Sequence, residues 1–221
     1  EFKTCFDREM VNKSNSDFNS PIIIIKMGEK KDKTRLVIDS RQLNSNTVVE
    51  RTPIPHATSI LYDIGTKISK SQNFYLSRLD LSKAYNQLRI HENDRKYSAF
   101  SFQGRSWEPS RMFYWFASAP ACWHRLMLKI FKDIPINIFF DDLIFCTSSF
   151  EEHISILNKI FERCIQYGLL IDENKCHLFV TDTEILGVRV TSKGLLPSKK
   201  HVSAITNYPI PNTRKKMKSF L

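Results

Sequence analysis

The sequence contains no run of about 18 apolar residues and no secretory leader, so it predicts neither a membrane span nor export. Cysteine is scarce: the 5 residues form no C-x-x-C pair and are odd in number. This favours reduced, mostly buried thiols in an intracellular protein over a disulfide framework or a zinc site. Three of the histidines, His153, His177 and His201, lack metal-ligand spacing, so surface or packing roles are expected for them. No internal repeat is found.

The sequence is rich in apolar residues and carries a net positive charge. Its 221 residues are 42% hydrophobic, enough for a sizeable core. Lysine and arginine number 33 against 23 acidic residues, a net charge of +10. That excess suits a partner with a phosphate backbone, although many basic proteins bind nothing specific. The chain begins at Glu1 without methionine and stops at Leu221, inside an apparent helix opened by Asn212 or Thr213, so we expect a segment of a longer protein.

Two adjacent acids, Asp141 and Asp142, lie between the apolar stretches 136–140 and 143–146. This pattern predicts the tip of a β-hairpin. The like charges repel, and a divalent cation bound to substrate phosphates would offset that repulsion. A polar two-residue turn is the alternative, and for the pair taken alone it is the better interpretation.

A third acid, Asp80, ends the strand-like stretch 74–79. An acid at the end of one strand and two at a hairpin tip can meet at one edge of a sheet. Two-metal nucleotidyl transfer needs such a cluster, because one cation activates a 3′-hydroxyl while the other steadies the leaving pyrophosphate. The alternative is that Asp80 caps the turn that follows, which would leave the flanks of both acidic sites unexplained.

Those flanks carry a family resemblance. Residues 139–142, Phe-Phe-Asp-Asp, resemble the Tyr-x-Asp-Asp box of reverse transcriptases, and 79–87 resemble the first catalytic-aspartate box. Residues 35–44 resemble the fingers segment R-x-x-x-D-x-R-x-L-N, and 185–188 the primer-grip turn. Residues 205–221 look like the start of the thumb in gypsy-type LTR retrotransposons. The five stretches stand in the family's order, from about residue 20 onward.

The resemblance implies an α+β right-hand polymerase fold, with fingers, a palm whose antiparallel sheet is backed by helices, and the start of a thumb. Fingers are expected over residues 1–53 and 88–118, and palm over 54–87 and 119–196. Residues 197–221 would be a truncated thumb.

The same resemblance implies an RNA-directed DNA polymerase that adds deoxynucleotides to a primer 3′-end and releases pyrophosphate. Its cofactors would be two Mg²⁺ ions, with Mn²⁺ as a substitute. Its partners would be an RNA or DNA template with primer, deoxynucleoside triphosphates and the rest of a Pol polyprotein, with no membrane. The implied location is intracellular, in the cytoplasm or in virus-like particles, without secretion.

Site residues follow from the matched boxes. The resemblance assigns catalysis to Asp80, Asp141 and Asp142, and metal binding to the same acids and the Leu81 carbonyl, with Asp142 the weakest candidate. Nucleotide binding falls to Arg35, Lys31, Ser82, Lys83, Ala84, Tyr85, Tyr114 and Trp115. Nucleic-acid binding falls to Asp39, Arg41, Phe139, Phe140, Leu186 and Gly187.

Three of these assignments have alternatives that stay open. The lysines of loop 27–34 form either a solvated turn or a cover over the incoming nucleotide. Asp39 and Arg41, two apart on an expected strand, point to one face and form a structural or template-contacting pair. Tyr85 is either a core aromatic or, as the resemblance favours, a ring that would clash with a 2′-hydroxyl and so select deoxynucleotides.

Trp115 departs from the family pattern. The second nucleotide-pocket box normally reads F-G-L-T-N-A-P, and Trp115 occupies its glycine position. Glycine allows close approach of backbone to a ligand, so an indole there would fill the pocket. Either the loop is shifted and the ring points elsewhere, or the copy is impaired. Two rival functions remain: a decayed or host-adopted copy that binds template without polymerising, and a basic nucleic-acid-binding module whose acids are incidental.

The remaining pattern gives the expected elements. Strands are expected at 22–26, 35–39, 169–172, 177–179 and 185–190, a helix at 60–71, and a hairpin from 98–102 and 107–113. Pro120 opens a helix whose apolar stripe, including Trp123, is interpreted as ordinary core. Ser149 begins a capping box. The helix that follows is expected to end at Gly168 and to bury Ile154, Leu157, Phe161, Cys164 and Ile165.

Overall fold

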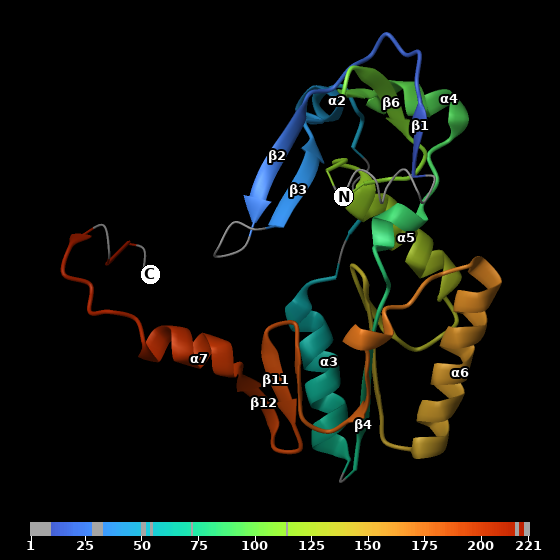
Figure 1. Ribbon diagram of the computed structural model, residues 1–221. Helices are drawn as coiled ribbons and strands as arrows, with labels where there is room; N and C mark the ends of the chain where they lie inside the picture. The colour runs from blue at the N-terminus through green and yellow to red at the C-terminus, as the bar shows by residue number, and fades with distance from the viewer. Residues whose placement is uncertain are drawn as a thin grey trace.

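The computed structural model describes residues 10–27, 33–49, 52–53, 55–71, 73–113, 115–214 and 217–218. Two lobes are visible in Figure 1. The upper lobe contains β1 (Val11–Lys13), β2 (Ile22–Met27), β3 (Lys33–Ile38), β5 (Phe100–Phe102) and β6 (Arg105–Pro109). The lower lobe is built around a four-stranded antiparallel sheet and carries the acids.

That sheet has the strand order β7–β8–β4–β9. The strands are β7 (Asn137–Phe139), β8 (Asp142–Thr147), β4 (Tyr75–Asp80) and β9 (His177–Val180). Both of its faces are covered, so the central strands bury side chains of either parity. Leu143 and Phe145 pack in one cluster with α5 (Ala119–Ile130) and α6 (Phe150–Tyr167), whereas Ile144 and Cys146 pack in another with α3 (Ala57–Lys70).

The α6 helix begins and ends as its sequence predicts. The Ser149 hydroxyl accepts a hydrogen bond from the Glu152 amide at 3.3 Å, and Gly168 adopts the left-handed conformation at φ 65°. The predicted apolar stripe is partly wrong, because Phe161 is 36% and Ile165 82% exposed. The buried side of the helix includes His153, a residue whose place could not be read from hydrophobic spacing.

The upper lobe packs a second core. Its three-stranded sheet has the order β1–β6–β5, beside the β2–β3 hairpin, and the cluster is Met10, Val11, Ile38, Phe100, Trp107 and Phe113. The β5–β6 turn has positive φ at Gln103 and Gly104, as a two-residue hairpin turn requires. Short helices complete the lobe: α2 (Arg41–Ser45), α4 (Glu92–Arg95) and the 3₁₀ helix η2 (Lys96–Ser98).

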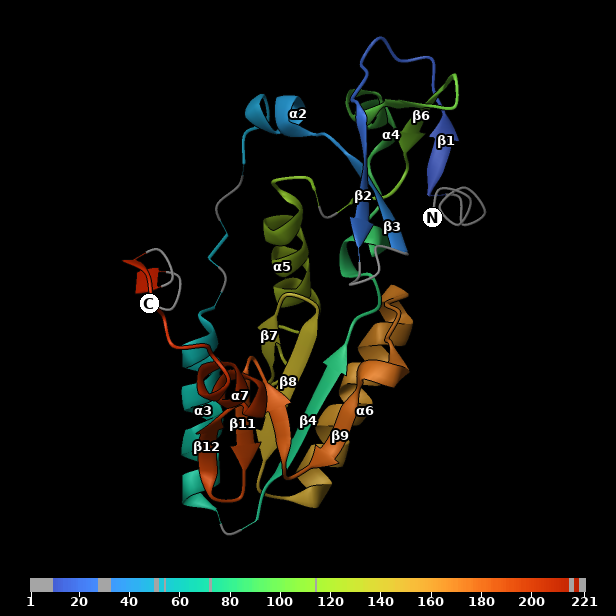
Figure 2. The same ribbon diagram turned by 60° about the vertical axis from the view of Figure 1, so that its left-hand side comes forward.

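The strands of the C-terminal part pack beside α3. Strands β10 (Thr183–Ile185), β11 (Val188–Thr191) and β12 (Gly194–Pro197) form a small sheet beside that helix, and α7 (Lys199–Thr206) follows (Figure 2). Stretch 169–172 is not a strand; it forms one bridge, Leu81 to Ile171, ahead of the 3₁₀ helix η3 (Glu173–Lys175).

The expected helix after residue 212 lies partly outside the described residues. No helix in the described part of the chain has the length and apolarity to cross a membrane. Of the cysteines, Cys122, Cys146, Cys164 and Cys176 are free.

Candidate active site

The hairpin that carries the acids turns at Phe140 and Asp141. Phe139 pairs with Asp142, so Asp142 is the first residue of β8 and the interpretation of a two-residue Asp-Asp turn is wrong. Phe140 holds a left-handed φ of 53°, which costs a non-glycine residue roughly 1–2 kcal/mol. The turn is therefore a strained one that contacts from its surroundings must stabilise.

Strand register brings the separate acids together. Asp80 is the last residue of β4 and pairs directly with Asp142, so both side chains leave the same face of the sheet. One residue later, the Leu81 amide donates to the Asp141 carbonyl at 2.8 Å. Asp141 itself is exposed at the turn. The sequence prediction that these acids meet at one edge of a sheet is confirmed.

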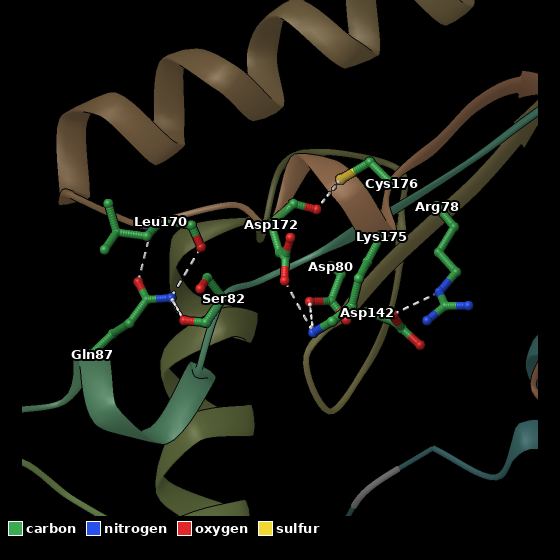
Figure 3. A network of polar contacts seen from close by, with 9 residues as sticks. All are labelled: Arg78, Asp80, Ser82, Gln87, Asp142, Leu170, Asp172, Lys175 and Cys176. Carbon is green, nitrogen blue, oxygen red and sulfur yellow. Dashed lines mark hydrogen bonds and ion pairs between the residues drawn. The ribbon is translucent and has the colours of Figure 1, made fainter. Parts of the chain in front are cut away.

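Asp80 is only 5% exposed and is paired with a cation of the chain itself. The ammonium of Lys175 lies 3.1 Å from its Oδ1 and 3.2 Å from Oδ2 of Asp172 (Figure 3). The hydrogen bond to Asp80, followed by that to Asp172, raises the pKa of Lys175. Sequence reasoning missed Lys175, because η3 reaches Asp80 only through the tertiary fold.

Asp142 has its own cation. The Nε of Arg78, from β4, donates to its Oδ1 at 2.8 Å (Figure 3). Burial raises the pKa of Asp142, the Arg78 guanidinium opposes that rise, and the charges of Asp141 and Asp80 add to it. The three carboxylates therefore interact electrostatically. Arg78 was also missed by the sequence prediction.

The acids offer oxygen donors of the kind that Mg²⁺ and Mn²⁺ prefer, carboxylates together with a backbone carbonyl beside them. Among the described residues, however, no three His, Cys, Asp or Glu side chains lie close enough to hold a metal as they stand. The donor types fit a divalent cation. As they stand, two of these carboxylates face cations of the chain itself: Asp142 is paired with Arg78, and Asp80 with Lys175.

A backbone clamp holds the segment after Asp80. The Asp172 amide donates to the Asp80 carbonyl at 2.9 Å and the Ser82 amide to the Leu170 carbonyl at 2.8 Å. Gln87, in the 3₁₀ helix η1 (Ala84–Gln87), donates to the carbonyls of Ser82 at 2.7 Å and Leu170 at 3.1 Å (Figure 3). Its Oε1 accepts from the Leu170 amide at 2.9 Å. The clamp fixes the exit of β4, where Asp80 and Leu81 lie.

The residues expected to bind nucleotide fall in several places. Lys83 has a left-handed φ of 50° and Ala84 is buried. Tyr85 is half-buried; burial raises its pKa, and so does the charge of Asp141. Arg35 pairs through its backbone with Ile25 in the β2–β3 hairpin. Lys31 and Tyr114 lie outside the described residues.

Trp115 packs with the upper lobe. Its ring stacks on Phe113, with centroids 4.5 Å apart and planes 7° from parallel, and it lies against the upper core. Asn44 of α2 holds the same loop: its Nδ2 donates to the Trp115 carbonyl and its Oδ1 accepts from the Ala117 amide, both at 3.0 Å. The indole therefore has a packed position of its own.

The prediction that Asp39 and Arg41 lie on a strand is wrong. β3 ends at Ile38 and α2 begins at Arg41, and the Arg41 amide donates to Asp39 across this boundary at 3.2 Å. Their side chains form an ion pair at 2.6 Å, and the side-chain hydrogen bond from Arg41 lowers the pKa of Asp39 to about 2.

The predicted primer-grip residues form a real turn. Leu186 and Gly187 have φ of 51° and 78° between β10 and β11. Leu186 and Phe139 both pack against the cluster formed by α3 and the sheet. The turn is thus built into the same core as the acidic hairpin.

Comparison with known proteins gives consistent matches. Residues 24–190 match the family model described as "Reverse transcriptase (RNA-dependent DNA polymerase)". The chain is 32% identical over 219 residues to the retrovirus-related Pol polyprotein from transposon 297 of Drosophila melanogaster, covering 96% of the chain and 20% of that protein. It is 28% identical over 228 residues to that from transposon gypsy of the same species, covering 100% of the chain and 21% of that protein.

Solved structures agree with the fold. The foamy viral protease-reverse transcriptase in complex with dsDNA matches with a TM-score of 0.86 at 25% identity, over 99% of this chain and 44% of that one. The same protein in complex with an RNA/DNA hybrid matches at 0.84, with 25% identity, over 99% of this chain and 28% of that one. The predicted α+β right-hand polymerase fold is confirmed. The chain spans about a fifth of the length of the two Pol polyproteins described above.

Proposed function

The chain belongs to the reverse transcriptase family, and we propose that it catalyses RNA-directed DNA synthesis. The reaction would add deoxynucleotides to a primer 3′-end and release pyrophosphate. The single observation that carries this proposal is the direct pairing of Asp80 with Asp142, with Asp141 adjacent at the turn. An incidental set of acids in a basic binding module would have no reason to converge in this way.

Metal binding is assigned to the carboxylates of Asp80 and Asp141 and to the carbonyl of Leu81. Two bound Mg²⁺ ions, or Mn²⁺ in their place, would activate the primer hydroxyl and stabilise the charge on the phosphates. Asp142 is the weakest ligand candidate, because its Oδ1 already accepts the Arg78 hydrogen bond. In our proposal, Arg78 opposes the rise that burial causes in the pKa of Asp142 and fixes the orientation of this carboxylate beside Asp80.

For the nucleotide we propose contacts from Lys31, Arg35 and the segment from Ser82 to Tyr85, with Tyr114 and Trp115 bordering the pocket. The Tyr85 ring, in the η1 segment just after Asp80 and Leu81, would exclude a 2′-hydroxyl. For template and primer we propose Asp39, Arg41, Phe139, Phe140, Leu186 and Gly187.

The domain assignment is part of the proposal: fingers over 1–53 and 88–118, palm over 54–87 and 119–196, and a partial thumb over 197–221. We propose a primed RNA or DNA template as the partner, since the foamy viral relative was solved with dsDNA and with an RNA/DNA hybrid. We also propose that the chain is part of a longer Pol polyprotein, as the names of its relatives support, and that this polyprotein is intracellular.

The test is primer extension by the 221-residue chain on a primed RNA template with Mg²⁺ and deoxynucleotides. Asp141→Asn is expected to abolish extension while retaining template binding, because it removes one charge and leaves the fold intact. Template binding by the wild type without any extension would instead support an impaired or host-adopted copy. Extension unchanged in Asp141→Asn would contradict the assignment of the acids.

A further inference from the structure

Trp123 is a fully buried residue of α5 whose indole reaches the acidic turn. Its Nε1 donates a hydrogen bond to the carbonyl of Phe140 at 2.7 Å. The apolar stripe of α5 packs in the core beneath the sheet, as its sequence predicts, but this N–H is a polar contact that packing alone does not require. It is made to the residue immediately before Asp141.

Two hydrogen bonds from different elements stabilise the turn, and they are accepted by the carbonyls of two consecutive residues. Trp123 holds that of Phe140, and the amide of Leu81, at the end of β4, holds that of Asp141 at 2.8 Å. Phe140 itself holds a left-handed φ of 53°, a conformation that a bulky side chain leaves readily when its contacts are lost. The direction of the Asp141 carboxylate depends on this backbone.

Trp123 has a second contact within the site. Its ring meets that of Tyr85 edge to face, with centroids 6.4 Å apart and planes at 88°. The hydrogen bond and the ring contact involve different parts of the indole. A phenylalanine keeps an apolar ring at this position and loses the N–H, so the two contributions are separable.

We propose that Trp123 is a positioning residue for Asp141, acting through its indole N–H on the Phe140 carbonyl. The inference rests on the proposed function in so far as Asp141 binds the catalytic metal. Without the N–H, the Phe140 carbonyl loses its partner and the turn is free to rotate, so the Asp141 carboxylate is no longer held in one position. The consequence is weaker metal binding and slower chemistry, with unchanged binding of primed template.

The experiment compares wild type with Trp123→Phe and with β-(3-benzothienyl)alanine at position 123, which removes the N–H with little change of volume. Trp107→Phe is the matched control, since Trp107 is a buried tryptophan of the upper lobe whose Nε1 donates to the Phe102 carbonyl at 3.3 Å. Free Mn²⁺ is titrated by electron paramagnetic resonance. Primer extension then gives kcat and the KM for primed template separately.

Both position-123 variants are expected to bind Mn²⁺ up to about tenfold more weakly, the effect of one lost hydrogen bond between neutral groups. Their kcat should fall by about tenfold or more, as misplacement of a catalytic group produces, with KM for primed template unchanged. Trp107→Phe should stay within about twofold of wild type in both. Should Trp123→Phe fail to fold, the benzothienyl variant alone decides.

Unchanged Mn²⁺ affinity in the benzothienyl variant would overturn the proposal, and so would a KM effect without a kcat effect. The positioning role of Trp123 and the proposed polymerase function are contradicted by different results. A wild type that extends no primer contradicts the proposed function, yet its Mn²⁺ titration still measures whether Trp123 supports the turn. Asp141→Asn, which should weaken Mn²⁺ binding directly, calibrates that measurement.

Discussion

The Nε2 of His153 lies 2.7 Å from the hydroxyl of Ser77, inside the core between α6 and the four-stranded sheet. Its Nδ1 lies 2.8 Å from the Thr147 hydroxyl, and its ring stacks on Phe145 with centroids 4.3 Å apart. Because His153 is fully buried, both ring nitrogens depend on these two hydroxyls. The histidine is thus a structural polar link rather than a catalytic base.

Stability should therefore fall in mild acid. Burial lowers the pKa of His153 from 6.5 to about 4, so between these values the unfolded chain takes up a proton that the folded chain does not. The free energy of unfolding should decrease as pH falls through this window, by roughly 3 kcal/mol at most. Urea denaturation at several pH values measures it. His153→Gln should flatten the slope, whereas replacing the exposed His56 by Gln should not; equal slopes in both would refute the assignment.

Arg78→Leu should destabilise the protein and raise the pKa of Asp142 further, because burial and the charges of Asp141 and Asp80 then act unopposed. We expect a loss of about 1–3 kcal/mol at neutral pH. A carboxyl with a raised pKa contributes stability at low pH that is lost as pH rises through that pKa, so the loss should shrink in acid.

Urea denaturation at neutral and acidic pH measures the effect of Arg78→Leu. Arg189→Leu is the control, since its partner Asp182 is an exposed carboxylate and exposed ion pairs contribute little to stability. Equal losses in the two variants, independent of pH, would show that the Arg78 pair has no special role.

Lys175→Met should make the protein's stability depend on Mg²⁺. The change leaves the nearly buried Asp80 without its ammonium partner, and a divalent cation would supply the missing positive charge. Differential scanning calorimetry should show a larger Mg²⁺-induced rise in Tm for this variant than for wild type. Lys129→Met, at an exposed position of α5, should respond as wild type does. The same Mg²⁺ effect in all three proteins would contradict the idea.

Trp115→Gly should lower stability without increasing extension. The ring stacks on Phe113 in the upper core, so its removal should cost about 3 kcal/mol or more. Thermal denaturation and primer extension measure the two effects, and Trp115→Phe should retain most of the stability. Faster extension by an undestabilised glycine variant would mean that the indole obstructs the nucleotide pocket.

Tyr85→Ala should admit ribonucleotides. Removing the ring opens space beside the proposed sugar position, so the preference for deoxynucleotides, measured as a ratio of kcat/KM values, should fall by at least about tenfold. Tyr97→Ala removes an exposed tyrosine that contacts Phe18 in the upper lobe and should leave that ratio unchanged. An unaltered ratio in Tyr85→Ala would make the ring a packing residue.

The features that the sequence predicted correctly are local ones. The hairpin that carries Asp141, the Ser149 cap and the Gly168 stop depend on residues close together in the chain, whose spacing carries the signal, although the hairpin turns one residue earlier than predicted. The three acids were found because each stands within a recognisable motif, Asp80 at the end of a strand and Asp141 and Asp142 at a hairpin turn. Their convergence could be expected, but only the register of β4 and β8 placed Asp80 opposite Asp142.

Tertiary structure alone decided which charges and rings these residues meet. Lys175 meets Asp80, Arg78 meets Asp142, and the N–H of Trp123 meets the Phe140 carbonyl, each across elements separated in the sequence. The Trp115 ring stacks on Phe113, a placement that its family motif did not predict. On α6, His153 is buried and Ile165 is exposed, the opposite of what the hydrophobic pattern predicts. The type of a residue determines which groups its side chain can bind. Which partners it actually meets depends on how separate elements pack, and that packing depends on the whole chain.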